Sequence, residues 1–562
     1  MIQNRPYRKL AAAILFFVAI GLLGYALTPG AIDPAPESVL PARTAVMLDL
    51  SNPESHARRF IKTPLGSRLL GMDWIRILTA LNVPVETAEV SLADDLDKTL
   101  NSQWFKELFG RKAILSWLPT RQPSALFQDQ LVVLARPRHR PAVVRWITRL
   151  FSTPAAPGIR SFSADPARPV FGAWSRGWFI AATALEPIRF CLDTANGDIP
   201  PLAGIDGFRD LKTDLAETAD IAFGYAAVEQ LSPHFSRHTP RGPSATRPVP
   251  ETHEKINSNT PSVAWAVRET AGGIHVRMLS HRAPSSLREP DRRQHATASS
   301  GGPDTVLSMA PAHSLAVFWA GNLGQKWLPG WLHSLLGPRV ADVDRWIRAN
   351  TGETMERIAR VVGPEAGWLL TDMGASSWIP VPDLALFFQV KNPVETSAVL
   401  ENLLRASGQK TRTEPVNNQI IRYVRFPWPV GIEPGYAMVN GYCLVASDRR
   451  ILRNMLHTLD AGNGLKTSAD VRSALPPVSN RSIRVAFVQT GRLAGQLEAT
   501  LKTLLPLASM QIDDKAGTLP LLSNELFRPI LDELKSAGPT GLTVVETRYG
   551  YQADLYLLES LE

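Results

Sequence analysis

Cysteine is scarce in this chain of 562 residues, which contains only Cys191 and Cys443. Two cysteines are too few for a disulfide-stapled scaffold or for a zinc site built from cysteines. Each lies in an apolar segment, where we expect a buried small hydrophobic residue rather than a reactive thiol. The sequence leaves open whether the two cysteines pair.

Recognisable metal, nucleotide and nucleophile motifs are also missing. The histidines are dispersed, and no His-Glu-x-x-His or His-Cys cluster occurs. His234 and His238 have a helical spacing, but Pro233 and Pro240 bracket them, which favours a solvated loop over a metal site. We therefore expect no metal, no cofactor and no enzymatic activity, although a site assembled from distant residues would escape a motif search.

Strong charge of one sign is absent as well. The net charge of +8 is modest for this length, and the basic residues are scattered without a nucleic-acid motif, which predicts no nucleic-acid partner. A mild positive charge fits anionic lipids or glycans, and it equally fits a chain with no such partner. The hydrophobic fraction of 44% and the charged fraction of 20% are typical of globular proteins.

One long apolar run is present, at the amino terminus. Residues 10–28 carry no charge, and a run of about 20 apolar residues can cross a bilayer. The basic residues within 1–9 precede this run and predict a cytoplasmic amino terminus. We therefore expect a transmembrane helix, followed by a Pro-rich spacer over 29–40. This arrangement predicts a single-pass protein of the bacterial inner membrane, with the bulk of its chain in the periplasm.

A cleaved signal peptide is the alternative for the same run. Gly24 and Ala26 have the small-residue spacing of a cleavage site. In that case the mature chain is secreted to the periplasm. Both alternatives place most of the chain outside the cytoplasm.

An internal repeat occupies most of the remaining sequence. The segment 173–183 resembles 437–447, and further matches follow in the same order along the chain, among them Ile221-Ala-Phe223 with Val485-Ala-Phe487. The matched positions are mostly glycine, proline and apolar residues, which serve turns and packing.

The repeat predicts two tandem homologous units, 41–283 and 304–562. The segment between them, 284–303, has almost no large apolar residue and is expected to be a linker. A similar polar stretch, 237–260, is expected to be a flexible insertion in the first unit.

Each unit has the pattern of a mixed fold. A strand is expected at 45–50, and hairpin turns are expected at Gly177 and Gly441, where Asn440-Gly441 is a strong turn signal. Hairpins mixed with helical crossovers indicate an α+β fold. We expect each unit to have a largely antiparallel sheet with helices on one face.

Two short segments combine large apolar and basic side chains and could contact a ligand or a partner. They are represented by Trp327, Trp331 and Arg339 in the second unit and by Phe60 and Arg68 in the first. The alternative is that these helices belong to the core, because their apolar positions recur in both units.

Several features together resemble a known family. They are Pro-Ala before the first strand, Gly110-Arg-Lys-Ala-Ile-Leu before the second, the Gly177 and Gly441 hairpins with a helix after each, and Leu202-Ala before Phe208. With these features the chain resembles an uncharacterised family of exported, membrane-anchored bacterial proteins, catalogued as a domain of unknown function. The resemblance covers most of residues 37–560 and implies an anchored envelope protein. It implies no substrate, cofactor or catalytic residue.

Three classes of function stay open at this point. An anchor, a spacer and paired units favour a membrane-anchored, non-catalytic binding or scaffolding module in the cell envelope, with envelope proteins as partners. The Trp-rich segments and the basic balance favour a carrier or sensor of lipid or glycan. The third class is an enzyme whose site no motif reveals.

Overall fold

The structure is a computed structural model of the whole chain. The residues that it describes are 35–72, 102–119, 130–138, 141–163, 169–228, 230–231, 261–270, 272–281, 302–323, 327–328, 330, 337–374, 381–406, 408–426, 432–476, 481–511, 523–547 and 550–559. Three predicted segments lie outside the described residues, namely 1–9, 10–28 and the insertion 237–260. The predicted linker 284–303 also lies outside them, except for its last two residues.

The membrane-spanning helix predicted from the sequence needs correction. Across the described ranges, no helix is both long enough and apolar enough to cross a membrane. The longest of these helices, α19 (Thr490–Gln511), carries Arg492, Glu498 and Lys502 and therefore has a polar face. Within these ranges the structure therefore gives no support to a single-pass membrane protein, and the segment 10–28 that carried this prediction lies outside them.

The predicted sheet arrangement is also wrong. The 20 strands within the described residues belong to one antiparallel sheet, not to two separate sheets. The physical reason is that an edge strand exposes unpaired N–H and C=O groups, which can pair with any other available edge. The pattern of apolar residues along one strand carries no information about that pairing.

The chain nevertheless divides into two compact units. The described residues of the first fall within Met1–Gly71, Ala88–Glu269 and Arg277–Leu287. Those of the second fall within Met72–Thr87, Thr270–Val276 and Arg288–Glu562. The domain boundaries expected from the sequence stay a prediction.

In the first unit, the strand nearest the amino terminus lies in the middle of the sheet. β1 (Val46–Ser51) pairs with β2 (Lys112–Trp117) on one side and with β8 (Ala222–Ala227) on the other. The sheet continues beyond β8 to β9 (Ser262–Thr270) and β10 (Gly273–His281), and the boundary between the units falls within this last hairpin. Beyond β2 come β3 (Leu131–Arg136), β7 (Trp178–Ala182), β6 (Phe171–Ser175), β5 (Ile159–Ser161) and β4 (Thr153–Ala156).

Helices pack on both faces of this part of the sheet. α8 (Leu185–Asn196) and α9 (Asp206–Leu215) cover one face and bury Ile188 and Phe208 in the core with the strands. α7 (Pro141–Leu150) lies on the opposite face, where the Trp174 indole Nε1 donates to the Thr148 hydroxyl at 3.1 Å. The prediction of helices on one face is therefore wrong. The remaining described helices of this unit are α2 (Pro53–Lys62), α3 (Pro64–Gly71) and α6 (Gln103–Phe109).

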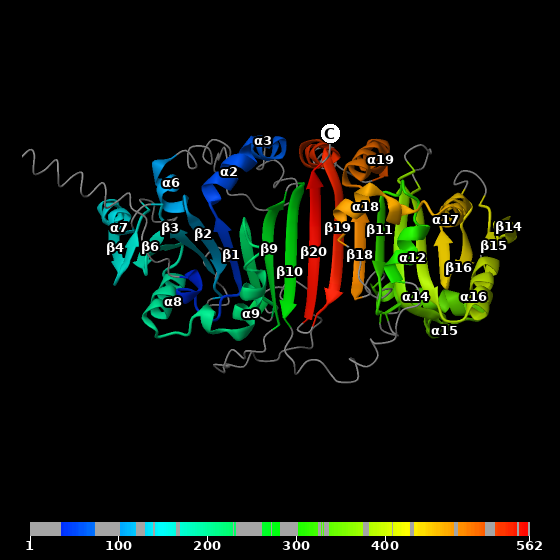
Figure 1. Cartoon of the computed structure of the whole chain (residues 1–562), viewed down its shortest axis with the longest axis horizontal. Helices are drawn as coiled ribbons and strands as arrows, with labels where there is room; N and C mark the ends of the chain where they lie inside the picture. The colour runs from blue at the N-terminus through cyan, green and yellow to red at the C-terminus, as the bar shows by residue number, and fades with distance from the viewer. Residues whose placement is uncertain are drawn as a thin grey trace, which may run out of the picture. The chain divides into compact units, whose positions relative to one another are not determined.

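The second unit has the same strand order. β11 (Ala316–Ala320) lies between β12 (Val362–Asp372) and β18 (Ser482–Val488), and Figure 1 shows β11, β18, β19 and β20 side by side. The elements outward from β18 are β19 (Ala537–Glu546) and β20 (Gly550–Glu559). Those outward from β12 are β13 (Asp383–Val390), β17 (Tyr442–Ala446), β16 (Gly435–Val439), β15 (Gln419–Tyr423) and β14 (Arg412–Val416).

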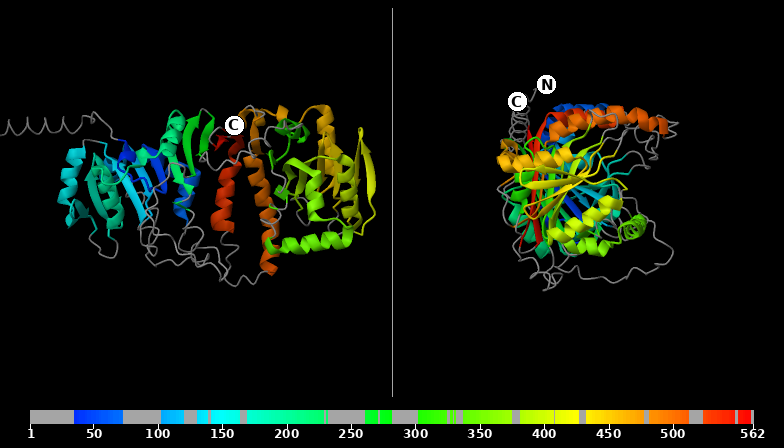
Figure 2. Two further views of the ribbon diagram at one scale, coloured as in Figure 1. Left: turned by 90° about the horizontal axis from the view of Figure 1, so that it is seen from below. Right: turned by 90° about the vertical axis from the view of Figure 1, so that its right-hand side faces the viewer.

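Helices again cover both faces. α12 (Gly302–Met309), α17 (Arg449–Ala461) and α18 (Ala469–Ala474) supply buried residues to the main core of the unit. On the other face, the Ser397 hydroxyl of α16 (Pro393–Ala406) lies 3.0 Å from that of Tyr436. α14 (Val340–Thr351) and α15 (Met355–Val361) pack against α16. α19 and α21 (Arg528–Lys535) lie side by side (Figure 2).

The strand register corrects one detail of the repeat. The Ser51 N–H donates to the Ile221 carbonyl at 3.1 Å, and the Gly321 N–H donates to the Ile483 carbonyl at 2.9 Å. Ile221 therefore corresponds to Ile483 rather than to Val485, a difference of two residues. A slip of two residues escapes detection because it returns every side chain to the same face of the sheet.

Candidate functional site

The five residues predicted to form a contact surface have different surroundings. Phe60 is 46% exposed, and Arg68 and Arg339 are exposed. Trp327 is half-buried, and its indole Nε1 donates to the Gly363 carbonyl at 3.2 Å. Trp331 lies outside the described residues. The cavities described below are lined by other residues, so a contact surface at these five positions stays a prediction.

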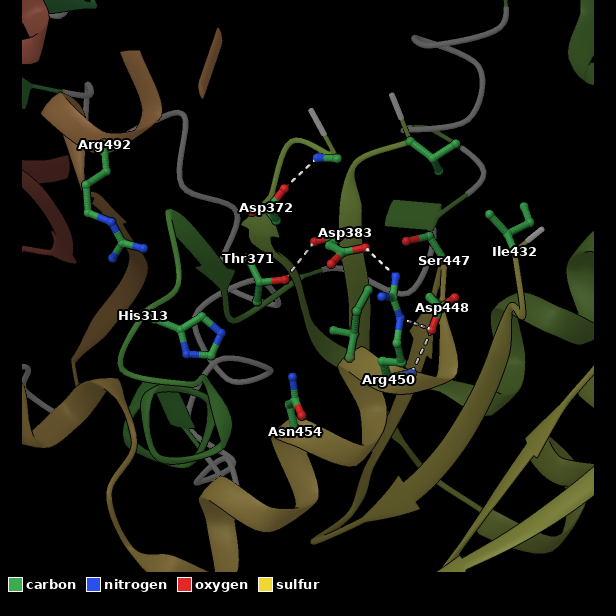
Figure 3. Close-up of a pocket in the computed structure, with 13 residues that line it drawn as sticks. His313, Thr371, Asp372, Asp383, Ile432, Ser447, Asp448, Arg450, Asn454 and Arg492 are labelled. Carbon is green, nitrogen blue, oxygen red and sulfur yellow. Dashed lines mark hydrogen bonds and ion pairs between the residues drawn. The ribbon is translucent and has the colours of Figure 1, made fainter. Parts of the chain in front are cut away.

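A polar cavity of about 510 Å³ lies in the second unit (Figure 3). Its size is within the usual range for small-molecule sites. We call it the acidic pocket, because three aspartates are among the residues that line it. Those residues are His313, Thr371, Asp372, Gly374, Val381, Asp383, Ile432, Ser447, Asp448, Arg450, Ile451, Asn454 and Arg492.

Two of the aspartates are brought together by strand pairing. Asp372 is the last residue of β12 and Asp383 is the first residue of β13, and the two are direct partners in the antiparallel register. Like charges placed opposite each other on neighbouring strands destabilise a sheet. The pair is therefore a local cost of the fold, as is common at functional sites.

The third aspartate is placed by helix capping. Asp448 precedes α17, and its carboxylate accepts a hydrogen bond from the Arg450 backbone N–H at 2.8 Å. The neighbouring Ser447 hydroxyl donates to the Pro382 carbonyl at 2.9 Å and accepts from the Leu384 N–H at 3.1 Å. These bonds fix the start of α17 beside the start of β13.

One guanidinium group lies between two of the carboxylates. Arg450 approaches Asp448 at 3.0 Å and Asp383 at 3.8 Å (Figure 3). The Asp372 carboxylate is held separately, since it accepts from the Gly374 N–H at 2.6 Å and from the Gln496 side-chain amide at 3.2 Å. Arg450 therefore contacts two of the three aspartates.

The pKa of Asp383 is affected by having three carboxylates and the single Arg450 guanidinium in this part of the pocket. Burial raises the pKa of the Asp383 carboxyl, Arg450 acts in the opposite direction, and the negative charges of Asp372 and Asp448 raise the pKa further. The net result is a pKa above the ordinary value of 3.8. The pocket therefore disfavours the ionised form of Asp383, and added positive charge would relieve this.

Groups that donate hydrogen bonds line another side of the pocket. Figure 3 shows the side chains of His313, Asn454 and Arg492 on the side away from Asp448. His313 and Arg492 are exposed, so both can reorient toward a ligand. The pocket thus offers carboxylate acceptors on one side and donors on another.

The three carboxylates do not form a metal site. Within the described residues, no group of three or more His, Cys, Asp or Glu side chains is arranged to hold a metal ion. The Arg450 guanidinium already lies between Asp383 and Asp448, where a metal would need both carboxylates. This arrangement suits an organic cation, which hydrogen-bonds to single carboxylate oxygens.

The two cysteines contribute no reactive group. Cys191 and Cys443 are free and fully buried. Burial raises the pKa of the Cys191 thiol to about 12 and also raises the pKa of Cys443. Both thiols therefore stay protonated at neutral pH.

Among its described residues, the first unit does not repeat the helix cap that places Asp448 in the acidic pocket. There the corresponding helix, α8, follows Ala184, which has no side chain able to accept a capping hydrogen bond. Sequence reasoning missed the pocket because Asp448 is far from Asp372 and Asp383 in the chain, and the pairing of β13 with β17 brings it beside them. The one available signal was the Asp448 cap before an amphipathic helical segment.

No family model, curated protein or solved structure matches this chain. The resemblance to an exported bacterial family and the periplasmic localisation therefore stay predictions. A function has to be argued from the pocket itself.

Proposed function

We propose that this chain is a non-catalytic binding module whose acidic pocket binds an organic cation. The ligand group is an alkylammonium or a guanidinium, either in a free small molecule or in a basic side chain of a partner protein. The observation that carries the proposal is the position of Asp383, which lies directly opposite Asp372 on the neighbouring strand and whose pKa is raised by burial and, to a lesser extent, by the carboxylates of Asp372 and Asp448.

A bound cation would lower the free energy of this arrangement. It would reduce the repulsion among the three carboxylates and make the ionised form of Asp383 favourable again. The donors on the opposite side, His313 and Arg492, would then contact hydroxyl or carboxylate groups of the same ligand.

The Ser447 contacts support binding rather than catalysis. Its hydroxyl is engaged with the Pro382 carbonyl and the Leu384 N–H, so it is not hydrogen-bonded to a base that could activate it. The carboxylates remain as acceptors of ligand hydrogen bonds, and they need no chemical step to serve that role.

The test is a calorimetric titration of the full chain with putrescine and, separately, with a lysine-rich peptide. Asp383→Asn removes one charge from the pocket and should weaken binding roughly tenfold, as expected for one hydrogen bond to a charged group. Asp460→Asn is the matched control, because Asp460 is exposed on α17 and does not line the pocket. A preference for putrescine identifies a small-molecule ligand, and a preference for the peptide identifies a protein partner.

The same titration over a range of pH provides a second readout. Since a cation prefers the ionised carboxylate, its affinity should rise as the pH rises through the elevated pKa of Asp383. Asp383→Asn should remove that part of the pH dependence. Equal binding by the wild type and Asp383→Asn, or no binding of either probe, would refute the proposal.

A further inference from the structure

A second cavity, of about 350 Å³, lies in the first unit and has the opposite character. We call it the basic pocket. It is formed where the ends of several elements meet, including the start of α2, the start of β2 and the end of β3. The residues that line it are Ala35, Pro36, Ser51, Asn52, Arg111, Lys112, Arg136, Trp178 and Lys212.

Four of the lining residues are cationic, and no lining residue carries a carboxylate. Two carboxylates lie behind the lysines and position them. The Lys112 ammonium lies 2.8 Å from the Asp49 carboxylate, and the Lys212 ammonium lies 2.5 Å from that of Glu37. Both acids are largely buried, with side-chain exposures of 7% and 10%. They therefore face the protein interior while the lysines reach the cavity.

The guanidinium of Arg136 is held in place by other contacts. It donates to the Gly177 carbonyl at 2.8 Å and lies 5.8 Å from the centre of the Trp178 ring. Arg136 itself is only 5% exposed. A cation fixed in this way loses little side-chain freedom when an anion binds, which favours affinity.

The amino terminus of α2 adds to the positive potential. Asn52, the residue that precedes this 10-residue helix, lines the pocket, and its side chain makes no capping hydrogen bond. The amino end of a helix carries a partial positive charge and attracts anions. The helix and the four cationic side chains therefore favour the same kind of ligand.

A comparison with the second unit shows that the backbone alone does not create this pocket. Asn52 and Asn322 follow the corresponding strands with similar left-handed backbones, at φ 47° and 54°. In the second unit, however, the side chains beside that turn form hydrogen bonds with one another. The Trp319 indole and the Tyr442 hydroxyl both donate to the fully buried carboxylate of Glu365. The pocket in the first unit therefore depends on its basic side chains.

We propose that the basic pocket binds a phosphoryl group. A phosphate monoester carries close to two negative charges at neutral pH and has three acceptor oxygens, which matches several ammonium and guanidinium donors in one cavity. The group belongs either to a soluble phosphate ester or to the headgroup of an anionic lipid. This proposal is independent of cation binding in the acidic pocket.

The first test measures binding of inorganic phosphate to the full chain by calorimetry. Arg111→Gln should weaken binding about tenfold, because one charge-assisted hydrogen bond is lost. Arg111 is exposed, so this substitution leaves the buried pairs of Lys112 and Lys212 intact. Arg189→Gln is the matched control, because Arg189 is an exposed residue of α8 that does not line the pocket.

Two further titrations distinguish the sources of the phosphoryl group. Glycerol phosphate tests a soluble ester. Phosphatidylcholine vesicles with and without phosphatidic acid test a lipid headgroup. Binding of either probe that Arg111→Gln weakens and Arg189→Gln preserves supports the proposal and identifies the source.

Three results would overturn it. The first is no detectable binding of phosphate, ester or vesicle, and the second is equal loss of binding in both variants. The third is equal affinity for chloride, which would show that only general screening is present. If Arg111→Gln fails to fold, Arg111→Lys keeps the charge and should retain most of the phosphate affinity.

Discussion

At the scale of single residues, a buried carboxylate of the second unit shows how much one hydrogen bond can matter. Glu365 is fully buried, and its Oε2 atom accepts from the Trp319 indole at 3.2 Å and from the Tyr442 hydroxyl. Burial and the nearby carboxylate of Glu365 raise the pKa of Tyr442, so this hydroxyl stays a donor. A carboxylate in a core is costly unless donors satisfy it.

Tyr442→Phe should therefore destabilise the protein by about 1–3 kcal/mol, the cost of removing one of the two donors to a buried carboxylate oxygen. Tyr436→Phe is the matched control, because the hydroxyl of Tyr436 pairs with the neutral Ser397. The control should cost only about 0.5–1.5 kcal/mol. Urea unfolding of both variants measures the difference, and an equal or smaller effect of Tyr442→Phe would contradict this account of Glu365.

No sequence pattern predicted these roles. Glu365 lies in a Gly-Pro-Glu-Ala-Gly segment, which is typical of a loop rather than of a core strand. Its donors, Trp319 and Tyr442, come from other strands. The same holds for Asp448, because the pairing of β13 with β17 and not sequence proximity places it beside Asp372 and Asp383.

At the scale of elements, local turn chemistry was readable from the sequence. β1 (Val46–Ser51) lies one residue from the strand expected at 45–50. The hairpins β6–β7 and β16–β17 turn at Gly177 and Gly441, where the turns were expected. Such turns can be predicted from the sequence because only some residue types accept positive φ. Pairing between strands that are not joined by a hairpin has no local sequence signal, and this is why the single sheet was not predicted.

The two hairpin turns predict different costs for the same substitution. Gly177 and Gly441 have nearly equal φ, 79° and 78°, so an alanine is strained at both, by about 1–2 kcal/mol. A Cβ at 441 meets no neighbouring atom within 4 Å, whereas a Cβ at 177 would lie 2.2 Å from the guanidinium of Arg136. Gly177→Ala should therefore be more destabilising than Gly441→Ala in denaturant unfolding. The reverse order would contradict the described contact with Arg136.

Gly177→Ala also bears on the basic pocket. Arg136 donates to the Gly177 carbonyl and lines that pocket, so displacement of its guanidinium should weaken phosphate binding. Gly441→Ala should leave phosphate binding unchanged, since Gly441 does not line the pocket. The two alanine variants therefore separate the stability of the hairpin from the placement of Arg136.

At the scale of the whole molecule, the two units share one strand order but differ in the charged side chains that line their candidate sites. The first unit has a cavity lined by four cations, and the second has a cavity lined by three aspartates. Each site is built within its own unit from residues that the other unit lacks. The central claim is therefore that one chain binds an organic cation and an anionic phosphoryl group at separate sites.

Native mass spectrometry of the full chain with putrescine and phosphate tests this claim most directly. The account predicts a complex that holds one of each ligand. Asp383→Asn should reduce only the putrescine complex, and Arg111→Gln should reduce only the phosphate complex. If neither ligand is retained above the level seen with an unrelated protein, or if each substitution removes both ligands equally, the two-site account is wrong.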